Sequence, residues 1–270
     1  MFLTETHLHT RESSACASAT GAQQAEQYKA LGYDTIFVTD HFFNGNTAVD
    51  RSLPWNEQVE LYCAGYENAK KRGDEIGLTV LFGIEYGWNA TDLLIYGVDK
   101  DWLLSYPDTL RISVQEFCDR VHMAGGCIVH AHPFREADYI NEMKFLPRQT
   151  DGVEVFNSGN RMNVWNERAE WYAGQYGKTM TAGTDCHHIS KDNDYFAGVY
   201  TDEKIETAAD YVRAVKNGLI RGLKTRCEDI TKVLGRGWHE QVRAGDNPSS
   251  CTNLFVQRVF PPDIERKQEN

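Results

Sequence analysis

Short runs of apolar and β-branched residues alternate along the chain with longer segments of helical periodicity. Seven runs have the length and composition of buried parallel strands, and they cover residues 2–8, 35–39, 79–84, 93–98, 127–131, 152–156 and 179–182. A strand followed by a helix reaches its parallel neighbour through a right-handed crossover. Seven such strands in so short a span fit a closed ring better than an open sheet. The sequence therefore predicts the α/β class and a seven-stranded, TIM-like (β/α) barrel.

The segments between these runs carry helix signals. Helices are expected at residues 21–31, 54–75, 113–124, 164–176 and 207–217, and most of them end beside a glycine. Beyond residue 226 the pattern weakens to a Gly-rich polar stretch at 235–248 and one candidate strand at 251–260. We expect a barrel domain over residues 1–226 and a C-terminal extension over 227–270 that packs on the barrel.

The charge and hydropathy of the chain exclude several classes of protein. Its 270 residues carry a formal net charge of −11, whereas a binder of long nucleic acid or of an anionic membrane presents a basic face. No run of 18 apolar residues occurs, so no membrane span is expected. The N-terminal residues do not resemble a secretory signal, and the seven cysteines include no C-x-x-C pair. These features predict a cytoplasmic protein with reduced thiols; the oligomeric state stays open.

Histidines are concentrated at the ends of the predicted strands. Seven of the nine lie in four segments, THLHT, TDHF, HAHPF and GTDCHH, and each segment ends a predicted strand. These histidines are His7, His9, His41, His130, His132, His187 and His188. Carboxylates end strands in the same way at Asp40, Glu85 and Asp185. The C-terminal ends of barrel strands meet on one face, where such folds place their chemistry.

The spacing of these residues favours metal binding. His7 and His9 are two residues apart, so both imidazoles lie on one side of a strand, and Asp185 and His187 repeat the arrangement. A single H-x-H pair in a strand is more often a pair of structural histidines than a metal site. Four histidine segments at strand ends together favour a metal centre. Imidazoles and carboxylates without thiolates suit Zn²⁺, Mn²⁺ or Fe²⁺. Their number exceeds what one ion needs, so two or three divalent ions are expected.

The strand-end segments also form an ordered set. In chain order they read H-x-H, T-D-H, G-I-E, A-H-P-F-R, D-G-V-E-V-F-N and G-T-D-x-H, from His7 to about His188. This set resembles the PHP domain, named for polymerase and histidinol phosphatase. The resemblance implies a distorted seven-stranded (β/α) barrel that holds two or three metal ions and hydrolyses phosphoesters.

The resemblance also implies a set of metal ligands in this chain. His7 and His9 would bind the first ion, and Asp185 would complete its site. Glu85 would bridge this ion to a second, which His132 also binds.

A third ion would be held by His41 and His187. Family members usually have another ligand, often His or Asp, in the loop after H-x-H. That loop reads TRESSAC here, and its Glu12 is either this ligand or a solvated loop glutamate. The family also commonly has a histidine at the fourth strand. This chain has none there, and Asp92 is the nearest substitute.

Residues beside the ligands have open roles. Arg135 follows the A-H-P segment at the barrel mouth, where it either clamps a phosphate or pairs with a nearby acid. His130 is expected on the same side of its strand as His132, as a catalytic or supporting residue or as a core histidine. Asn157 and His188 are candidates for substrate contact. Asp40 is expected to orient a metal-binding histidine rather than bind an ion.

These observations predict a metal-dependent hydrolase acting on phosphoester bonds. The substrate would be a small phosphate mono- or diester, histidinol-phosphate-like or a nucleotide, attacked by a metal-activated hydroxide. No G-x-S-x-G elbow is present, and Cys16 and Cys186 are interpreted as small packed residues, so no covalent nucleophile is expected. The loops at 44–55 and 138–149 hold Trp55, Tyr139 and Phe145, which either stack a ring of the substrate or pack.

Two other functions remain open. An amidohydrolase-type enzyme also opens with H-x-H, but it requires a metal-bridging lysine at the fourth strand, and the nearest lysine is Lys100. A non-catalytic metal-binding module is the second alternative, and the nearly complete ligand set argues against it.

Overall fold

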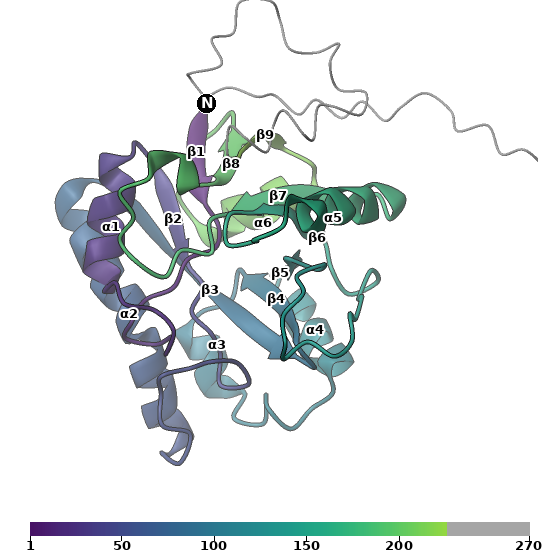
Figure 1. The fold of residues 1–270 in the computed structure, drawn as a ribbon. Helices are drawn as coiled ribbons and strands as arrows, with labels where there is room; N and C mark the ends of the chain where they lie inside the picture. The colour runs from purple at the N-terminus through teal and green to yellow at the C-terminus, as the bar shows by residue number, and fades with distance from the viewer. Residues whose placement is uncertain (226–270) are drawn as a thin grey trace, which may run out of the picture.

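The structure is a computed structural model, and it describes residues 1–225 (Figure 1). Its strands are β1 (Phe2–Glu5), β2 (Thr35–Val38), β3 (Thr79–Trp88), β4 (Thr91–Tyr96), β5 (Cys127–Ala131), β6 (Gly152–Asn157), β7 (Thr179–Gly183), β8 (Gly198–Thr201) and β9 (Ile220–Lys224). Its helices are α1 (Gly21–Ala30), α2 (Trp55–Ile76), α3 (Lys100–Ser105), α4 (Val114–Met123), α5 (Asn163–Gln175) and α6 (Ala208–Lys216), with one 3₁₀ turn, η1 (Asn193–Tyr195). The extension expected over 227–270 lies outside the described residues, and so does its candidate strand.

The strands form one mixed sheet in the order β7-β6-β5-β4-β3-β2-β1-β8-β9. The α/β class is therefore confirmed, but the predicted count of seven strands is wrong, because β8 and β9 add two. Both extra strands are short, four and five residues. The prediction that all strands are parallel is also wrong, because β4 runs antiparallel to β3 and β5, and β8 to β1 and β9.

The reversal of β4 has a local cause in the turn before it. Only Asn89 and Ala90 separate β3 from β4, and both have positive φ, 49° and 60°. Two central residues with positive φ are the pattern of a type I′ hairpin turn, whose twist matches that of the flanking strands. This turn folds β4 directly back on β3, so no crossover helix is needed.

The sheet nearly closes into a barrel at the C-terminal ends of β1 and β7. Beyond these strands, Leu8 and Cys186 form a parallel bridge. The amide of His9 donates to the carbonyl of Cys186 at 2.8 Å, and the amide of Asp185 donates to the carbonyl of His7 at 2.8 Å. Backbone pairing across the closure therefore sets the segments that carry the candidate ligands side by side.

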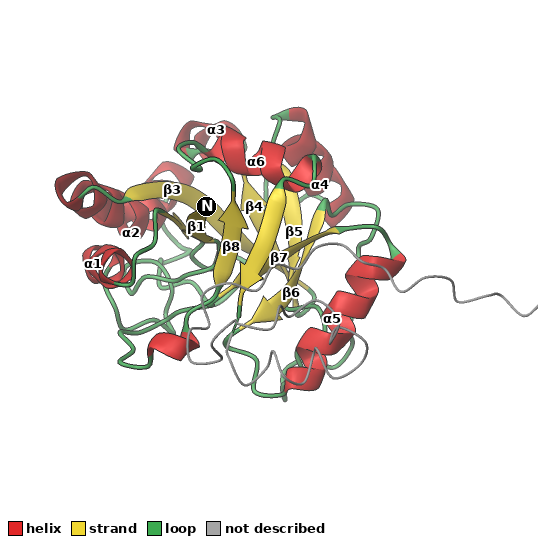
Figure 2. Cartoon of the chain, turned by 90° about the horizontal axis from the view of Figure 1, so that it is seen from above, coloured by secondary structure: helices red, strands yellow, loops and turns green. Residues whose placement is uncertain are grey.

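The helices lie outside the strands (Figure 2). Helix α1 begins with a capping box between Thr20 and Gln23, and α2 ends at Gly77, whose φ of 70° a side chain would strain. Among the strands, Phe37 packs on Tyr96 with ring centroids 4.9 Å apart, and both rings are buried. No helix within residues 1–225 is long and apolar enough to cross a membrane.

Helix α2 approaches the candidate site closely at Gly65. A Cβ added there would lie 1.9 Å from Thr10 Oγ1 and 3.0 Å from Asp40 Oδ2. We expect Gly65→Ala to lower the free energy of unfolding by at least about 1 kcal/mol, because this overlap outweighs the helix propensity that alanine gains. Urea unfolding of Gly65→Ala checks this, with Lys71→Ala on the exposed face of α2 as the control. Equal stability of both variants would contradict the close approach.

Candidate metal centre

Donor atoms from five strands or strand ends (β1, β2, β3, β5 and β7) converge where the barrel closes. Three groups of side chains have their nitrogen and oxygen atoms within 4.8 Å of one another, and the groups share members. The groups are His7, His9 and Asp185; His7, Glu85 and His132; and His9, His41 and His187. The structure thus brings together the seven residues to which the family resemblance assigns the three ions.

The first group sits on the β1–β7 closure. His7 Nε2 lies 3.2 Å from His9 Nε2, and Asp185 Oδ1 lies 3.5 Å and 3.1 Å from these two atoms. Asp185 has a φ of 58°, so its carboxylate departs from strand geometry to face the imidazoles. All three side chains are buried. Three ligand atoms therefore face one point at the end of the barrel.

Glu85 joins the three groups. Its Oε1 lies 3.2 Å from His7 Nε2 and 3.2 Å from His132 Nε2, and its Oε2 lies 2.5 Å from His41 Nδ1. A parallel backbone bridge between Glu85 of β3 and His41, which follows β2, holds the last pair together. Glu85 is 1% exposed, and its two oxygens face imidazole nitrogens rather than solvent. A buried carboxylate is costly unless positive charge lies close to it, so the site fits divalent ions.

The electrostatics of the site support this fit. Burial alone would raise the pKa of Glu85, but the charges of His41 and His7 hold it well below its usual value. Burial would likewise raise the pKa of Asp185, yet His7 and a neighbouring arginine hold it well below its usual value. Burial lowers the pKa of His9, which favours its neutral form. Ionised carboxylates beside a neutral imidazole form a donor set suited to Zn²⁺, Mn²⁺ or Fe²⁺.

Asp40 orients His9 through Ser14. Ser14 Oγ donates to Asp40 Oδ1 at 2.7 Å, so the same oxygen accepts from His9 Nδ1 at 3.1 Å. The proton of His9 is thereby fixed on Nδ1, and the lone pair of Nε2 faces the first group. Asp40 also accepts from Thr10 Oγ1 at 2.7 Å. This arrangement matches the orienting role expected for Asp40.

Glu154 of β6 orients His7 and His132 and was not identified from the sequence. His7 Nδ1 donates to Glu154 Oε1 at 2.9 Å, while Oε2 accepts from the His132 amide at 3.0 Å and from Asn157 Nδ2 at 2.9 Å. The sequence does contain a sign of this role, because a glutamate within the apolar run G-V-E-V-F is unusual in a buried strand. Asn157, expected to touch substrate, therefore supports Glu154.

We expect Glu154→Gln to weaken metal binding by about 10- to 100-fold, because it removes the carboxylate that fixes the His7 ring. The glutamine keeps the size of the side chain, so the fold is expected to persist. Titration with Zn²⁺ against a competing chelator measures the affinity, and exposed Glu203 supplies the matched control, Glu203→Gln. Unchanged affinity in Glu154→Gln would contradict the orienting role.

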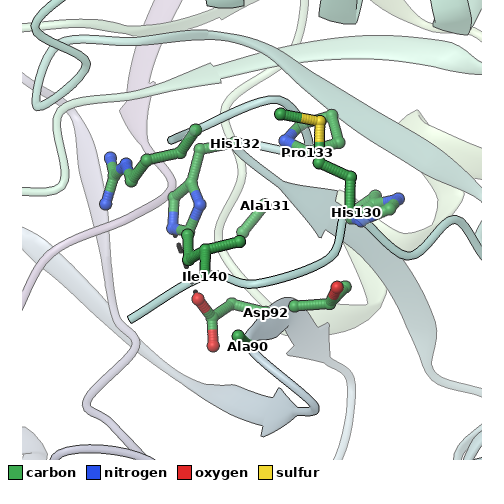
Figure 3. A pocket seen from close by; sticks show the side chains of 10 residues that line it. Ala90, Asp92, His130, Ala131, His132, Pro133 and Ile140 are labelled. Atoms are coloured by element: carbon green, nitrogen blue, oxygen red, sulfur yellow. Dashed lines mark ion pairs between the residues drawn. The ribbon is translucent and has the colours of Figure 1, made fainter. Parts of the chain in front are cut away.

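Asp92 stands at the second group, where the family commonly has a histidine. Its Oδ2 lies 3.9 Å from His132 Nε2, as the dashed line in Figure 3 shows. Burial raises the pKa of Asp92 to about 6, and the charge of Glu85 adds to the effect. Asp92 is thus near enough to supplement the second group.

Three sequence candidates do not join the groups. His130 lies on the opposite side of Ala131 from His132 (Figure 3), because His132, with a φ of 25°, no longer follows the strand. The His130 ring packs on Phe145, with ring centroids 6.1 Å apart, and burial lowers its pKa to about 3. The expectation that His130 and His132 share a side is therefore wrong.

Glu12 and His188 also lie outside the three groups. The Glu12 carboxylate accepts from the amide of Gly21, the first residue of α1, at 3.1 Å, and from Asn68 Nδ2 at 2.7 Å. It therefore binds a helix N-terminus and a helix side chain rather than the cluster. His188 is exposed, and its ring lies 5.7 Å from that of Tyr195.

A cavity of about 680 Å³ opens over the metal groups. Its lining includes Glu85, Asp92, His132, Asp185 and His187 of the candidate site. Arg135 lines it as well and is held on three sides. Its Nη2 donates to Asp185 Oδ2 at 2.7 Å and to Asn157 Oδ1 at 2.8 Å, and its Nε donates to Asn160 Oδ1 at 3.0 Å. Arg135 thus pairs with an acid, which is one of the two roles expected for it. Its side chain also borders the cavity.

Two aromatic side chains also line the cavity, Trp88 at the end of β3 and Tyr139 in the segment between β5 and β6. Trp55 instead packs on Phe43, with ring centroids 5.2 Å apart. Cys16 also lines the cavity. Burial alone would raise the pKa of the Cys16 thiol, but hydrogen bonds and charge from His187 and His41 lower it to about 6.

Lys100 lies at the start of α3 and contacts carboxylates of α2 rather than the donor groups. Its Nζ pairs with Glu60 at 2.6 Å and with Glu67 at 2.7 Å, both on α2. It does not line the cavity. The lysine that an amidohydrolase-type centre requires is therefore not supplied by this residue.

Comparison with known proteins agrees with these features. A family model described as PHP-associated matches residues 163–219. No curated protein matches the sequence significantly. The fold is similar to that of a two-domain protein containing a predicted PHP-like metal-dependent phosphoesterase from Bacteroides vulgatus, with 14% identity, a TM-score of 0.60, and coverage of 87% of this chain and 69% of that one.

PsfC from Pseudomonas syringae is also similar, with 14% identity, a TM-score of 0.54, and coverage of 89% of this chain and 98% of that one. At such identities the solved structures show a shared fold. The chain therefore carries a PHP-associated match over residues 163–219 and shares the fold of these two structures, and its strand-end histidines and carboxylates are the ordered set that resembles the PHP domain.

Proposed function

We propose that this protein is a metal-dependent phosphoesterase that hydrolyses a small phosphate mono- or diester. The observation that carries the proposal is the convergence of three donor groups on Glu85, beneath a cavity that Arg135 borders. A cavity of about 680 Å³ suits a small molecule rather than a long polymer. Histidinol-phosphate-like compounds and nucleotides are the substrate classes that we propose.

The ligands that would hold two or three ions are His7, His9, His41, Glu85, His132, Asp185 and His187. When bound, divalent ions of the Zn²⁺, Mn²⁺ or Fe²⁺ type supply a water of lowered pKa and stabilise charge on phosphoryl oxygens. Glu154, and Asp40 acting through Ser14, fix the ring orientations of His7 and His9.

Arg135 would bind the phosphate. Nε and Nη2 of its guanidinium already donate to protein oxygens, whereas Nη1 has no hydrogen-bond partner among residues 1–225. Because Asp185 and Asn157 hold the guanidinium rigidly, Nη1 can donate to a non-bridging oxygen without further ordering. Arg135 would thus bind the phosphate and position Asp185 at the same time.

The same wall of the cavity offers groups for the rest of the substrate. Asp92, which lines the cavity, is the carboxyl group proposed to protonate the leaving alkoxide. Trp88 and Tyr139 present aromatic surface to a ring on the leaving group, such as an imidazole or a nucleobase.

Turnover of two chromogenic esters tests the proposal. The full chain, stripped with a chelator, is expected to hydrolyse p-nitrophenyl phosphate or its bis-ester only after Mn²⁺ or Zn²⁺ is restored. The ratio of the two rates then distinguishes a phosphatase from a phosphodiesterase. If neither ester is hydrolysed with either ion, although metal is bound, the phosphoesterase proposal fails and a metal-binding module becomes the better account.

A further inference from the structure

The loop between β1 and α1 places a thiol in the wall of the cavity that His41 and His187 also line. The resemblance led us to expect a carboxylate there, but Glu12 is engaged by Gly21 and Asn68. Cys16 lines the cavity together with His41 and His187, and it is the exposed thiol among the five cysteines that the structure describes.

Backbone hydrogen bonds fix Cys16 between the two strand ends that carry His41 and His187. On one side of it, the Ala15 amide donates to the Asn46 carbonyl at 2.9 Å. On the other side, the Ser18 amide donates to the His187 carbonyl at 2.8 Å. The residue that carries the thiol is therefore attached to the same backbone framework as the two imidazoles, and it lines the same cavity as both of them.

We infer that Cys16 is a thiolate ligand of the ion held by His41 and His187. The inference rests on the proposed metal centre and refines it. One group then combines sulfur and imidazole donors, while the groups around Asp185 and His132 offer only imidazole and carboxylate donors. Thiolate ligands favour Zn²⁺ and Fe²⁺ over harder ions such as Mn²⁺. The third group is therefore expected to prefer Zn²⁺ or Fe²⁺ to Mn²⁺, and the other two groups are expected to discriminate less between these ions.

The thiol nearest in sequence to a ligand does not compete for this role. Cys186 is buried, and its Sγ donates to the carbonyl of His188 at 3.0 Å. Cys63 is buried on α2, away from the cavity lining, and supplies a matched control.

Cobalt spectroscopy of the full chain tests the inference. Loading with Co²⁺ is expected to give a near-ultraviolet sulfur-to-cobalt charge-transfer band. Cys16→Ser is expected to abolish the band and to lower the bound metal by one equivalent, while Cys63→Ser leaves both unchanged. His41→Ala, which keeps the thiol but removes an imidazole from the same group, is expected to weaken the band.

The metal content of the same samples separates two kinds of failure. A wild-type protein that binds two or more equivalents but shows no band, or a band that persists in Cys16→Ser, overturns the assignment of Cys16 alone. A wild-type protein that binds no metal overturns the proposed function as well. Thiol labelling of the wild type gives a second readout, because bound Zn²⁺ is expected to slow the modification of one exposed cysteine.

Discussion

Replacing Glu85 with glutamine is expected to reduce turnover by about 1,000-fold or more, because the change removes a carboxylate that belongs to the second donor group and lies beside histidines of the other two. Glu85 lies 3.2 Å from both His7 and His132 and 2.5 Å from His41. An amide of the same size keeps the packing but loses the charge that attracts the cations. Steady-state kinetics with restored metal measure the loss.

The matched control for this variant is Glu57→Gln, which removes a carboxylate from the exposed face of α2. It is expected to leave turnover and metal content unchanged, since surface substitutions of this kind have small effects. Metal content of Glu85→Gln is expected to fall together with turnover. A Glu85→Gln protein that retains wild-type turnover would contradict the shared-ligand role of Glu85.

Replacing Arg135 with alanine is expected to reduce kcat by about 100- to 1,000-fold, the usual effect of removing one donor from a developing negative charge. The change also frees Asp185, whose Oδ2 loses its 2.7 Å contact to Nη2. Kinetics of Arg135→Ala on both chromogenic esters measure the effect. Metal content of the same sample shows whether Asp185 still completes the first group.

Arg135→Lys sharpens this test. Lysine keeps the charge but not the planar fork, which donates to Asn157, Asn160 and Asp185 together. We therefore expect little recovery from the lysine variant. The matched control is Arg168→Ala on α5, where the side chain is 48% exposed and pairs with Glu136. Wild-type kcat in Arg135→Ala would exclude a role for the guanidinium in the reaction.

Much of the fold could be predicted from local pattern. All seven predicted runs overlap observed strands, and each of the five predicted helices overlaps an observed helix. The direction of β4 could not be predicted from hydrophobic pattern, since a buried strand reads the same in either direction. The turn at Asn89 and Ala90 decides it, and a two-residue turn without glycine is a weak signal.

The candidate site was predictable where backbone geometry fixes the side chain. His7 and His9 share a side as period two requires, and their convergence on Asp185 follows from strand ends meeting on one face. The same reasoning was wrong for His130, because His132 leaves the strand conformation. The sequence also did not predict that Glu12 binds Gly21 and Asn68, or that Cys16, expected to be a small packed residue, is exposed at the cavity, because the path of a loop depends on long-range hydrogen bonds.

The number of divalent ions bound per chain tests the central claim most directly. Elemental analysis of the purified, reconstituted full chain is expected to find two or three equivalents. His9→Ala is expected to lose at least one of them and metal-dependent turnover, since His9 belongs to two of the donor groups. One equivalent or none in the wild type, or an unchanged content in His9→Ala, would contradict a multinuclear centre at this end of the barrel.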